Sequence, residues 1–211
     1  MAVSQSIYLG FDPGGAHKFG VALLDGERLI ASTVSTVDDA VEWSVKICGS
    51  RQPVAAGIDT LLHWATAKSG MRPCDLHLRD RYRPVRNSVM APNSLYGAMA
   101  IGGMALAMRL REVWSEIMLN ETHPKVLLHE LKVQRYNSES VATAIKQFMD
   151  RAGCTDGGIQ GEHQFDAALS AWATREGLEN NWEDLAEDKQ GLLFPVGPVR
   201  YLWPSHKSFS P

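Results

Sequence analysis

Four acids and one histidine have the types and positions to hold a metal ion. Asp12, Asp59 and Glu121 each stand at the end of a short apolar run. Asp166 lies near the start of a helical stretch, with His163 three residues earlier on the same helix face. Carboxylates gathered in one pocket repel each other, and hard divalent cations relieve that repulsion. The pattern predicts a site for Mg²⁺ or Mn²⁺, with two ions activating water and stabilising the leaving oxygen in phosphodiester hydrolysis.

Each acid also has an ordinary structural explanation. Asp12 begins an Asp-Pro-Gly-Gly sequence, in which aspartate commonly opens a β-turn. Asp59 could cap the next segment, and Glu121 could favour the positive end of the following helix. Asp166 alone would be a solvated helix residue. Because three strand-end acids and a histidine–aspartate pair occur together, the joint pattern favours a shared site over coincidence.

The first third of the sequence predicts the elements that would position these acids. Asp25-Gly26 is a strong hairpin signal, and Thr36 and Gly49 bracket a helical period. If the crossover after this helix is right-handed, the fourth strand lies parallel to the first. The expected elements are strands at 7–11, 19–24, 28–33 and 54–58 and a helix at 37–48.

The rest of the sequence predicts mainly helices around one further strand. Pro124 is well placed as the first residue of a helix. The expected elements are helices at 94–115, 124–132, 139–152 and 162–175 and a fifth strand at 117–119. The predicted fold class is α/β, a five-stranded mixed sheet flanked by helices in one domain over 1–211. That domain carries a basic insertion at about 60–90, without a clean period, and an extended tail from about 191.

The basic insertion is the candidate nucleic-acid-binding segment. Its cations outnumber its two aspartates, and Trp64 and Tyr82 are interleaved with them. Arginines bind phosphate oxygens, and aromatic rings stack on unpaired bases. An ordinary charged loop is the alternative explanation, and no motif decides between DNA and RNA. The candidate cations are Lys68, Arg72, Arg79, Arg81, Arg83 and Arg86.

Composition excludes several classes of protein. Of the 211 residues, 45% are hydrophobic and 21% are charged, which excludes a disordered or coiled-coil chain. A net charge of −3 excludes a polycationic binder, so nucleic acid would need a local basic patch. Cys48, Cys74 and Cys154 form no CxxC pair, which disfavours a zinc site and a disulfide framework. We expect a cytoplasmic protein, because neither a signal peptide nor a membrane span is evident.

Two segments resemble a known group of enzymes. The sequence GFDPGG at 10–15, followed by FGVA at 19–22, resembles the first strand and turn of RuvC-like resolvases in the ribonuclease-H-like superfamily. The sequence HQFDAAL at 163–169 resembles the closing helix of that group. The wider pattern is similar to a family of uncharacterised, predicted ribonuclease-H-like nucleases. Its marks are GID at 57–59, CD at 74–75, ETHP at 121–124 and DAALSAW at 166–172.

The resemblance implies a ribonuclease-H-like five-stranded mixed sheet and a Mg²⁺- or Mn²⁺-dependent nuclease. By motif, Asp12, Asp59 and Asp166 would be metal ligands. Glu121 and His163 would be supporting ligands or proton-transfer groups. Nucleic acid is the expected partner, no membrane is expected, and whether the chain forms a homodimer stays open.

Two other functions stay open beside a nuclease. A non-catalytic nucleic-acid-binding or scaffold protein could keep the same fold, and its binding would need neither the acids nor a metal. The Asp-Pro-Gly-Gly turn also resembles the phosphate loop of actin-like phosphotransferases. Those enzymes need two related lobes, and 211 residues with one such loop disfavour them.

Overall fold

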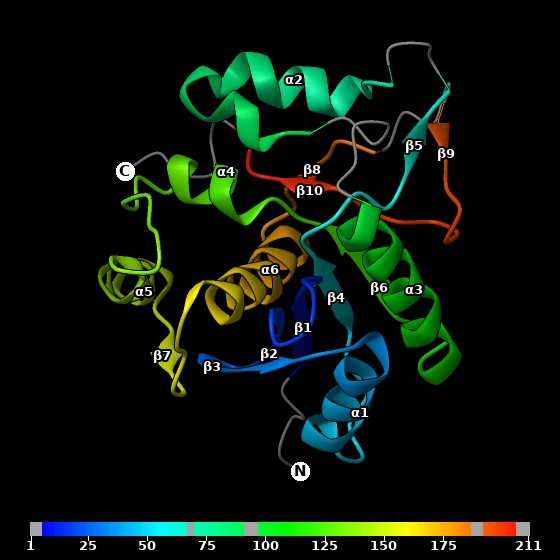
Figure 1. Cartoon of the computed structure of the whole chain (residues 1–211), viewed down its shortest axis with the longest axis vertical. Coiled ribbons are helices and arrows are strands. Elements are labelled where there is room, and N and C mark those ends of the chain that lie inside the picture. The colour runs from blue at the N-terminus through cyan, green and yellow to red at the C-terminus, as the bar shows by residue number, and fades with distance from the viewer. Residues whose placement is uncertain (1–5, 67–69, 91–96, 187–191, 206–211) are drawn as a thin grey trace.

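The chain folds around a six-stranded mixed sheet with helices on both faces (Figure 1). A computed structural model describes residues 6–66, 70–90, 97–186 and 192–205. The strand order is β6-β4-β1-β2-β3-β7. The strands are β1 (Ile7–Asp12), β2 (Phe19–Asp25), β3 (Arg28–Val34), β4 (Ala55–Ile58), β6 (Met118–Glu121) and β7 (Thr155–Asp156).

The strand directions confirm the predicted topology. β1, β2 and β3 are joined antiparallel, β4 runs parallel to β1, and β6 runs parallel to β4. The predicted number of five strands is wrong by one, because β7 adds a strand parallel to β3. β7 is only two residues long, so it is too short to show a period in the sequence.

The helices divide between the two faces of the sheet. α6 lies across one face and packs on β1, β2, β3 and β4, while α1 and α3 pack together on the other (Figure 1). Each face has its own apolar core, with Tyr8 and Leu24 in one and Leu9 and Phe11 in the other. This division follows from the two-residue period of strand side chains. The helices are α1 (Val37–Cys48), α3 (Gly97–Val113), α4 (Pro124–Glu130), α5 (Val141–Ala152) and α6 (Glu162–Glu179).

Glycines bring α6 unusually close to the sheet. A Cβ at Gly10 would lie 2.0 Å from the carbonyl oxygen of Ala167, and one at Gly20 would lie 1.9 Å from that of His163. Both distances are far below van der Waals contact, so only glycine allows this approach. The first turns of α6 therefore lie directly over the end of β1, where Asp12 stands.

Residues 60–90 contain more structure than the predicted loop. They form β5 (Trp64–Ala65), α2 (Pro73–Arg81) and the 3₁₀ helix η1 (Arg83–Ser88). The buried residues of α2 are Cys74, Asp75 and Leu78, so its inner face includes a charge. A hydrophobic pattern cannot reveal a helix whose buried face is partly ionic.

The C-terminal segment pairs with other parts of the chain. β9 (Leu192–Leu193) pairs with β5, and β10 (Leu202–Trp203) pairs with β8 (Glu183–Asp184). Arg200 also forms a parallel bridge with Asn120 of β6 and so covers that edge of the large sheet. Within the described ranges, no helix has the length and apolar character needed to cross a membrane.

Candidate active site

Three of the predicted acids converge on the face of the sheet that α6 covers. The register pairs Phe11 with Ile58, so Asp12 and Asp59 are the next residues on two neighbouring parallel strands. The Asp59 backbone N–H donates to the Phe11 carbonyl at 2.9 Å, which fastens the two strand ends together. Asp166 is added from α6, and both Asp12 and Asp166 are buried.

Repulsion between the carboxylates raises the pKa of two of them. Burial and the charges of Asp12 and Asp166 raise the pKa of Asp59 well above its usual range. Burial and the charge of Asp12 raise the pKa of Asp166 to about 7. The ammonium group of Lys125 opposes the pKa rise at both residues. Acids this close favour proton sharing or the binding of a cation.

Two of the acids have hydrogen-bond partners within the chain. His163 Nδ1 lies 2.6 Å from Asp12 Oδ2, and this contact raises the pKa of the half-exposed imidazole. The Tyr136 hydroxyl donates to Asp166 Oδ1, and burial followed by the Asp166 charge raises the pKa of that phenol. Tyr136 was not predicted as a site residue, because a single tyrosine in an irregular segment gives no signal in the sequence.

Glu121 lies in a different environment from the other acids. The register pairs Ile58 with Glu121, so the residue beside Asp59 on the face toward α6 is Thr122. The Thr122 hydroxyl accordingly lies 2.8 Å from the Ser170 hydroxyl of α6. Because strand side chains alternate between faces, Glu121 points to the opposite side of the sheet. A strand-end position in the sequence does not specify which face a side chain takes.

Glu121 belongs to a fully buried ionic network. Arg72 Nη2 donates to Glu121 Oε1 at 2.6 Å and to Asp75 Oδ1 at 2.7 Å. His63 Nδ1 lies 3.0 Å from Glu121 Oε2, which also accepts the Leu62 backbone N–H. Although burial opposes ionisation, Arg72 and His63 hold the pKa of Glu121 well below its usual range. The network ties α2 and the segment after β4 to the end of β6.

The prediction that Arg72 contacts nucleic acid is wrong, because Arg72 belongs to this network. Arg72 is fully buried and its guanidinium is occupied by carboxylates, so it presents no cation to a ligand. The interleaved aromatic Tyr82 is also buried, and its hydroxyl accepts a hydrogen bond from Trp203 Nε1. Trp64 is half-buried in β5. The stacking role predicted for these two rings has no support in the structure.

The remaining cations of the insertion differ in availability. Arg79 donates to the carbonyl oxygens of Arg86 and Val89, and Arg81 pairs with Glu130 at 3.1 Å. Arg83 is exposed beside Asp80, and Arg86 is also exposed. Lys68 lies outside the described residues. Most of the cations described in this segment therefore serve the fold.

A cavity of about 350 Å³ opens beside Asp59. Lys125 and Arg135 line it together with His123, which is buried. These two cations were not predicted as site residues, because each stands alone in the sequence between neutral neighbours. They place positive charge beside Asp59, in a part of the chain outside the insertion that was predicted to bind nucleic acid.

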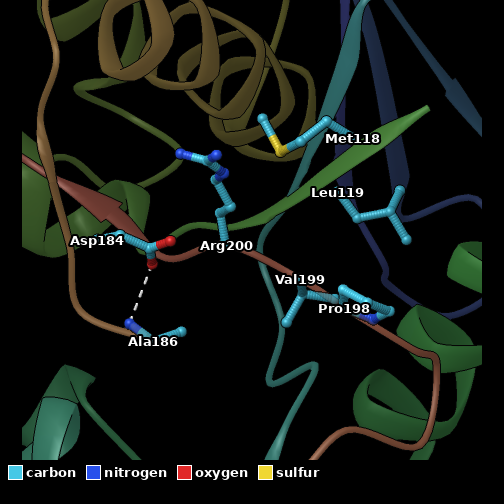
Figure 2. Close-up of a pocket in the computed structure, with 7 residues that line it drawn as sticks. All are labelled: Met118, Leu119, Asp184, Ala186, Pro198, Val199 and Arg200. Atoms are coloured by element: carbon cyan, nitrogen blue, oxygen red, sulfur yellow. Dashed lines mark hydrogen bonds between the residues drawn. The ribbon is translucent and has the colours of Figure 1, made fainter. Parts of the chain in front are cut away.

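A larger cavity, of about 570 Å³, lies at the β6 edge of the sheet (Figure 2). Figure 2 shows the Asp184 side chain turned toward the backbone of Ala186, whose N–H it accepts at 3.0 Å. The same Asp184 oxygen accepts the Tyr201 N–H. This carboxylate therefore fastens the C-terminal segment, and we place the candidate chemistry at the acids beside α6.

Carboxylate oxygens are the ligands that Mg²⁺ and Mn²⁺ prefer, so the donor types at Asp12, Asp59 and Asp166 suit these ions. As the side chains are placed, no three His, Cys, Asp or Glu residues of the described ranges form a group that could hold one ion. The contacts of Asp12 with His163 and of Asp166 with Tyr136 each occupy one of the two oxygens of the carboxylate.

Comparisons with known proteins yielded structural neighbours only. No family model matches the chain, and no curated protein sequence matches it. The structure of Thermus thermophilus RuvC is similar, with a TM-score of 0.48 and 12% identity over 82% of this chain and 96% of that chain. T. thermophilus RuvC in complex with a Holliday junction substrate has a TM-score of 0.47, with the same identity and coverage.

Proposed function

We propose that this chain is a nuclease of the ribonuclease-H-like superfamily that hydrolyses phosphodiester bonds with Mg²⁺ or Mn²⁺. The convergence of Asp12, Asp59 and Asp166 on one sheet face, where burial and mutual repulsion raise the pKa of two of them, carries this proposal. The proposal is supported by the strand directions, because the sequence resemblance implies a mixed sheet, and β1 to β3 are antiparallel whereas β4 and β6 run parallel to β1.

In this proposal Asp12, Asp59 and Asp166 hold the metal. A bound divalent ion would stabilise negative charge on the phosphate and lower the pKa of a water. His163 is half-exposed and its Nδ1 lies 2.6 Å from Asp12 Oδ2, so it is placed to transfer a proton at Nδ1. Tyr136 orients the Asp166 carboxylate through its hydroxyl. Glu121 acts at a distance, by fixing the segment that follows Asp59.

The experiment is a cleavage assay on single strands, branched DNA and RNA–DNA hybrids with Mg²⁺, Mn²⁺ or chelator. Wild type should cleave at least one substrate only with metal. Asp12→Asn and Asp166→Asn should each abolish cleavage while far-ultraviolet circular dichroism shows an intact fold. Cleavage at the wild-type rate by either variant would remove that residue from the proposed machinery.

The pairing of two acids with His163 and Tyr136 favours a second candidate, a nucleic-acid-binding protein without catalysis. In that case, nucleic acid should bind equally well to wild type and Asp12→Asn in the presence of chelator. Absence of metal-dependent cleavage together with unchanged binding would establish this second function over the first.

A further inference from the structure

The cavity beside Asp59 has two chemically different walls. Lys125 and Arg135 line it together with Met90 and Met99. A neighbouring cavity is lined by both cations and neither methionine, and another by both methionines and neither cation, so the two pairs lie on different sides. A smaller cavity of about 110 Å³ shares Asp59 and both methionines. One ligand filling this space would meet cations on one side and apolar, polarisable groups on the other.

The cationic wall is available for a ligand. Both Lys125 and Arg135 are exposed, and they also line a second cavity that reaches Tyr136. Arg81, by contrast, is nearly buried and paired with Glu130. The charge of Lys125 is felt at Asp59 and Asp166, so this cation lies close to the acids without neutralising them. A phosphate here would be attracted by Lys125 and Arg135 and would lie beside the proposed metal ligands.

The thioether wall suits a flat, uncharged ring. Methionine is flexible and polarisable and makes favourable contacts with rings. Met99 is 39% exposed, so it presents apolar surface at the cavity rather than in the core. Asn87 also lines the cavity, and its amide can both donate and accept hydrogen bonds. Phosphate-binding cations, an apolar wall and one adaptable polar group together match the parts of a nucleotide.

We propose that this cavity binds one unpaired nucleotide next to the scissile phosphate, with its phosphate at Lys125 and Arg135 and its base against Met90 and Met99. The inference rests on the proposed nuclease function and adds the substrate class. In a duplex, a base is stacked and paired, so it reaches a side pocket only after it leaves the helix. The substrate is therefore a nucleic acid that is single-stranded or unpaired at the cleavage point.

The test measures binding without cleavage. Fluorescence anisotropy in Ca²⁺ compares 12-nucleotide single strands of DNA and RNA, a duplex of the same length, and an abasic strand of equal charge. The variants are Lys125→Ala, Arg135→Ala and Met90→Ala. Lys46→Ala is the matched control, because Lys46 is an exposed lysine on α1.

Wild type should prefer the normal single strand to both the duplex and the abasic strand. Lys125→Ala and Arg135→Ala should each weaken single-strand binding about fivefold and reduce its salt slope by about 0.7. Met90→Ala should reduce the preference for the normal over the abasic strand, and Lys46→Ala should behave as wild type. Lys125→Ala should bind Mn²⁺ at least as tightly as wild type, because it removes a neighbouring positive charge.

Failure of this inference differs from failure of the nuclease proposal. If Lys125→Ala and Arg135→Ala bind the strand as wild type does, or if the abasic strand binds equally well, the nucleotide pocket is refuted. Mn²⁺ binding by the acids would then still support the nuclease proposal. If wild type binds no Mn²⁺, the nuclease proposal fails, whatever the strand affinities are.

Discussion

Because Asp166 is buried beside Asp12, we predict that its ionised carboxylate destabilises the metal-free protein at neutral and alkaline pH. Burial and the Asp12 charge raise its pKa from 3.8 to about 7, so the folded state holds this proton more tightly than the unfolded state. The free energy of unfolding should therefore fall as pH rises between these two values, and it should flatten above about pH 8. Asp166→Asn removes the ionisation and keeps an oxygen that can accept the Tyr136 hydroxyl.

The magnitude follows from the acid constants. At about 1.4 kcal/mol for each tenfold change, the advantage of Asp166→Asn over wild type should grow by about 3 kcal/mol between pH 4.5 and pH 8. Urea unfolding across this range in metal-free buffer measures the difference. Adding Mn²⁺ at pH 8 should raise the stability of wild type more than that of the variant.

Asp150→Asn is the control, because Asp150 is an exposed acid on α5. Its difference from wild type should not change with pH. If the difference between Asp166→Asn and wild type is also constant with pH, the pKa of Asp166 is not raised. The acids would then not be crowded enough to require a cation.

Two further predictions concern the elements that position the site. Gly10→Ala should lower the free energy of unfolding by about 1–3 kcal/mol and weaken Mn²⁺ binding, because the new Cβ would displace α6. Urea unfolding and metal titration measure the two effects. Gly15→Ala is the control and should change neither quantity, because Gly15 has open space around it. Arg72→Met should cost about 3–5 kcal/mol in the same unfolding assay, since it leaves Glu121 buried without its counterion. Arg83→Ala, at an exposed pair, should cost about 0.5 kcal/mol or less, and equal losses for the two arginines would refute the structural role of Arg72.

Local signals explain why much of the fold could be predicted. The helix α1 has the predicted bounds because Thr36 Oγ1 accepts the Asp39 N–H at 3.0 Å and Gly49 ends the helix with a positive φ. The hairpin between β2 and β3 turns at Gly26, which also has a positive φ. Caps and turns act within a few residues, so a single sequence contains the information that specifies them.

The arrangement of the site could be predicted only in part, because it depends on contacts between residues far apart in the sequence. The strand-end positions of Asp12, Asp59 and Glu121 were correct, but the face of each side chain depends on register, which turns Glu121 away from the others. The cluster of arginines indicated a surface, whereas Arg72 is the cation of a buried network. The cations beside Asp59 come from separate segments, and only the tertiary fold brings Lys125 to the cavity.

The metal site is tested most directly by calorimetric titration of Mn²⁺ into wild type, Asp59→Asn and the control Asp150→Asn at pH 8. Asp59 is the best residue for this test, because no side chain of the described residues donates a hydrogen bond to its carboxylate in the structure, unlike Asp12 and Asp166. We predict saturable binding by wild type and Asp150→Asn and its loss in Asp59→Asn. Equal binding by Asp59→Asn and wild type, or no binding by wild type, would contradict a metal site at these acids.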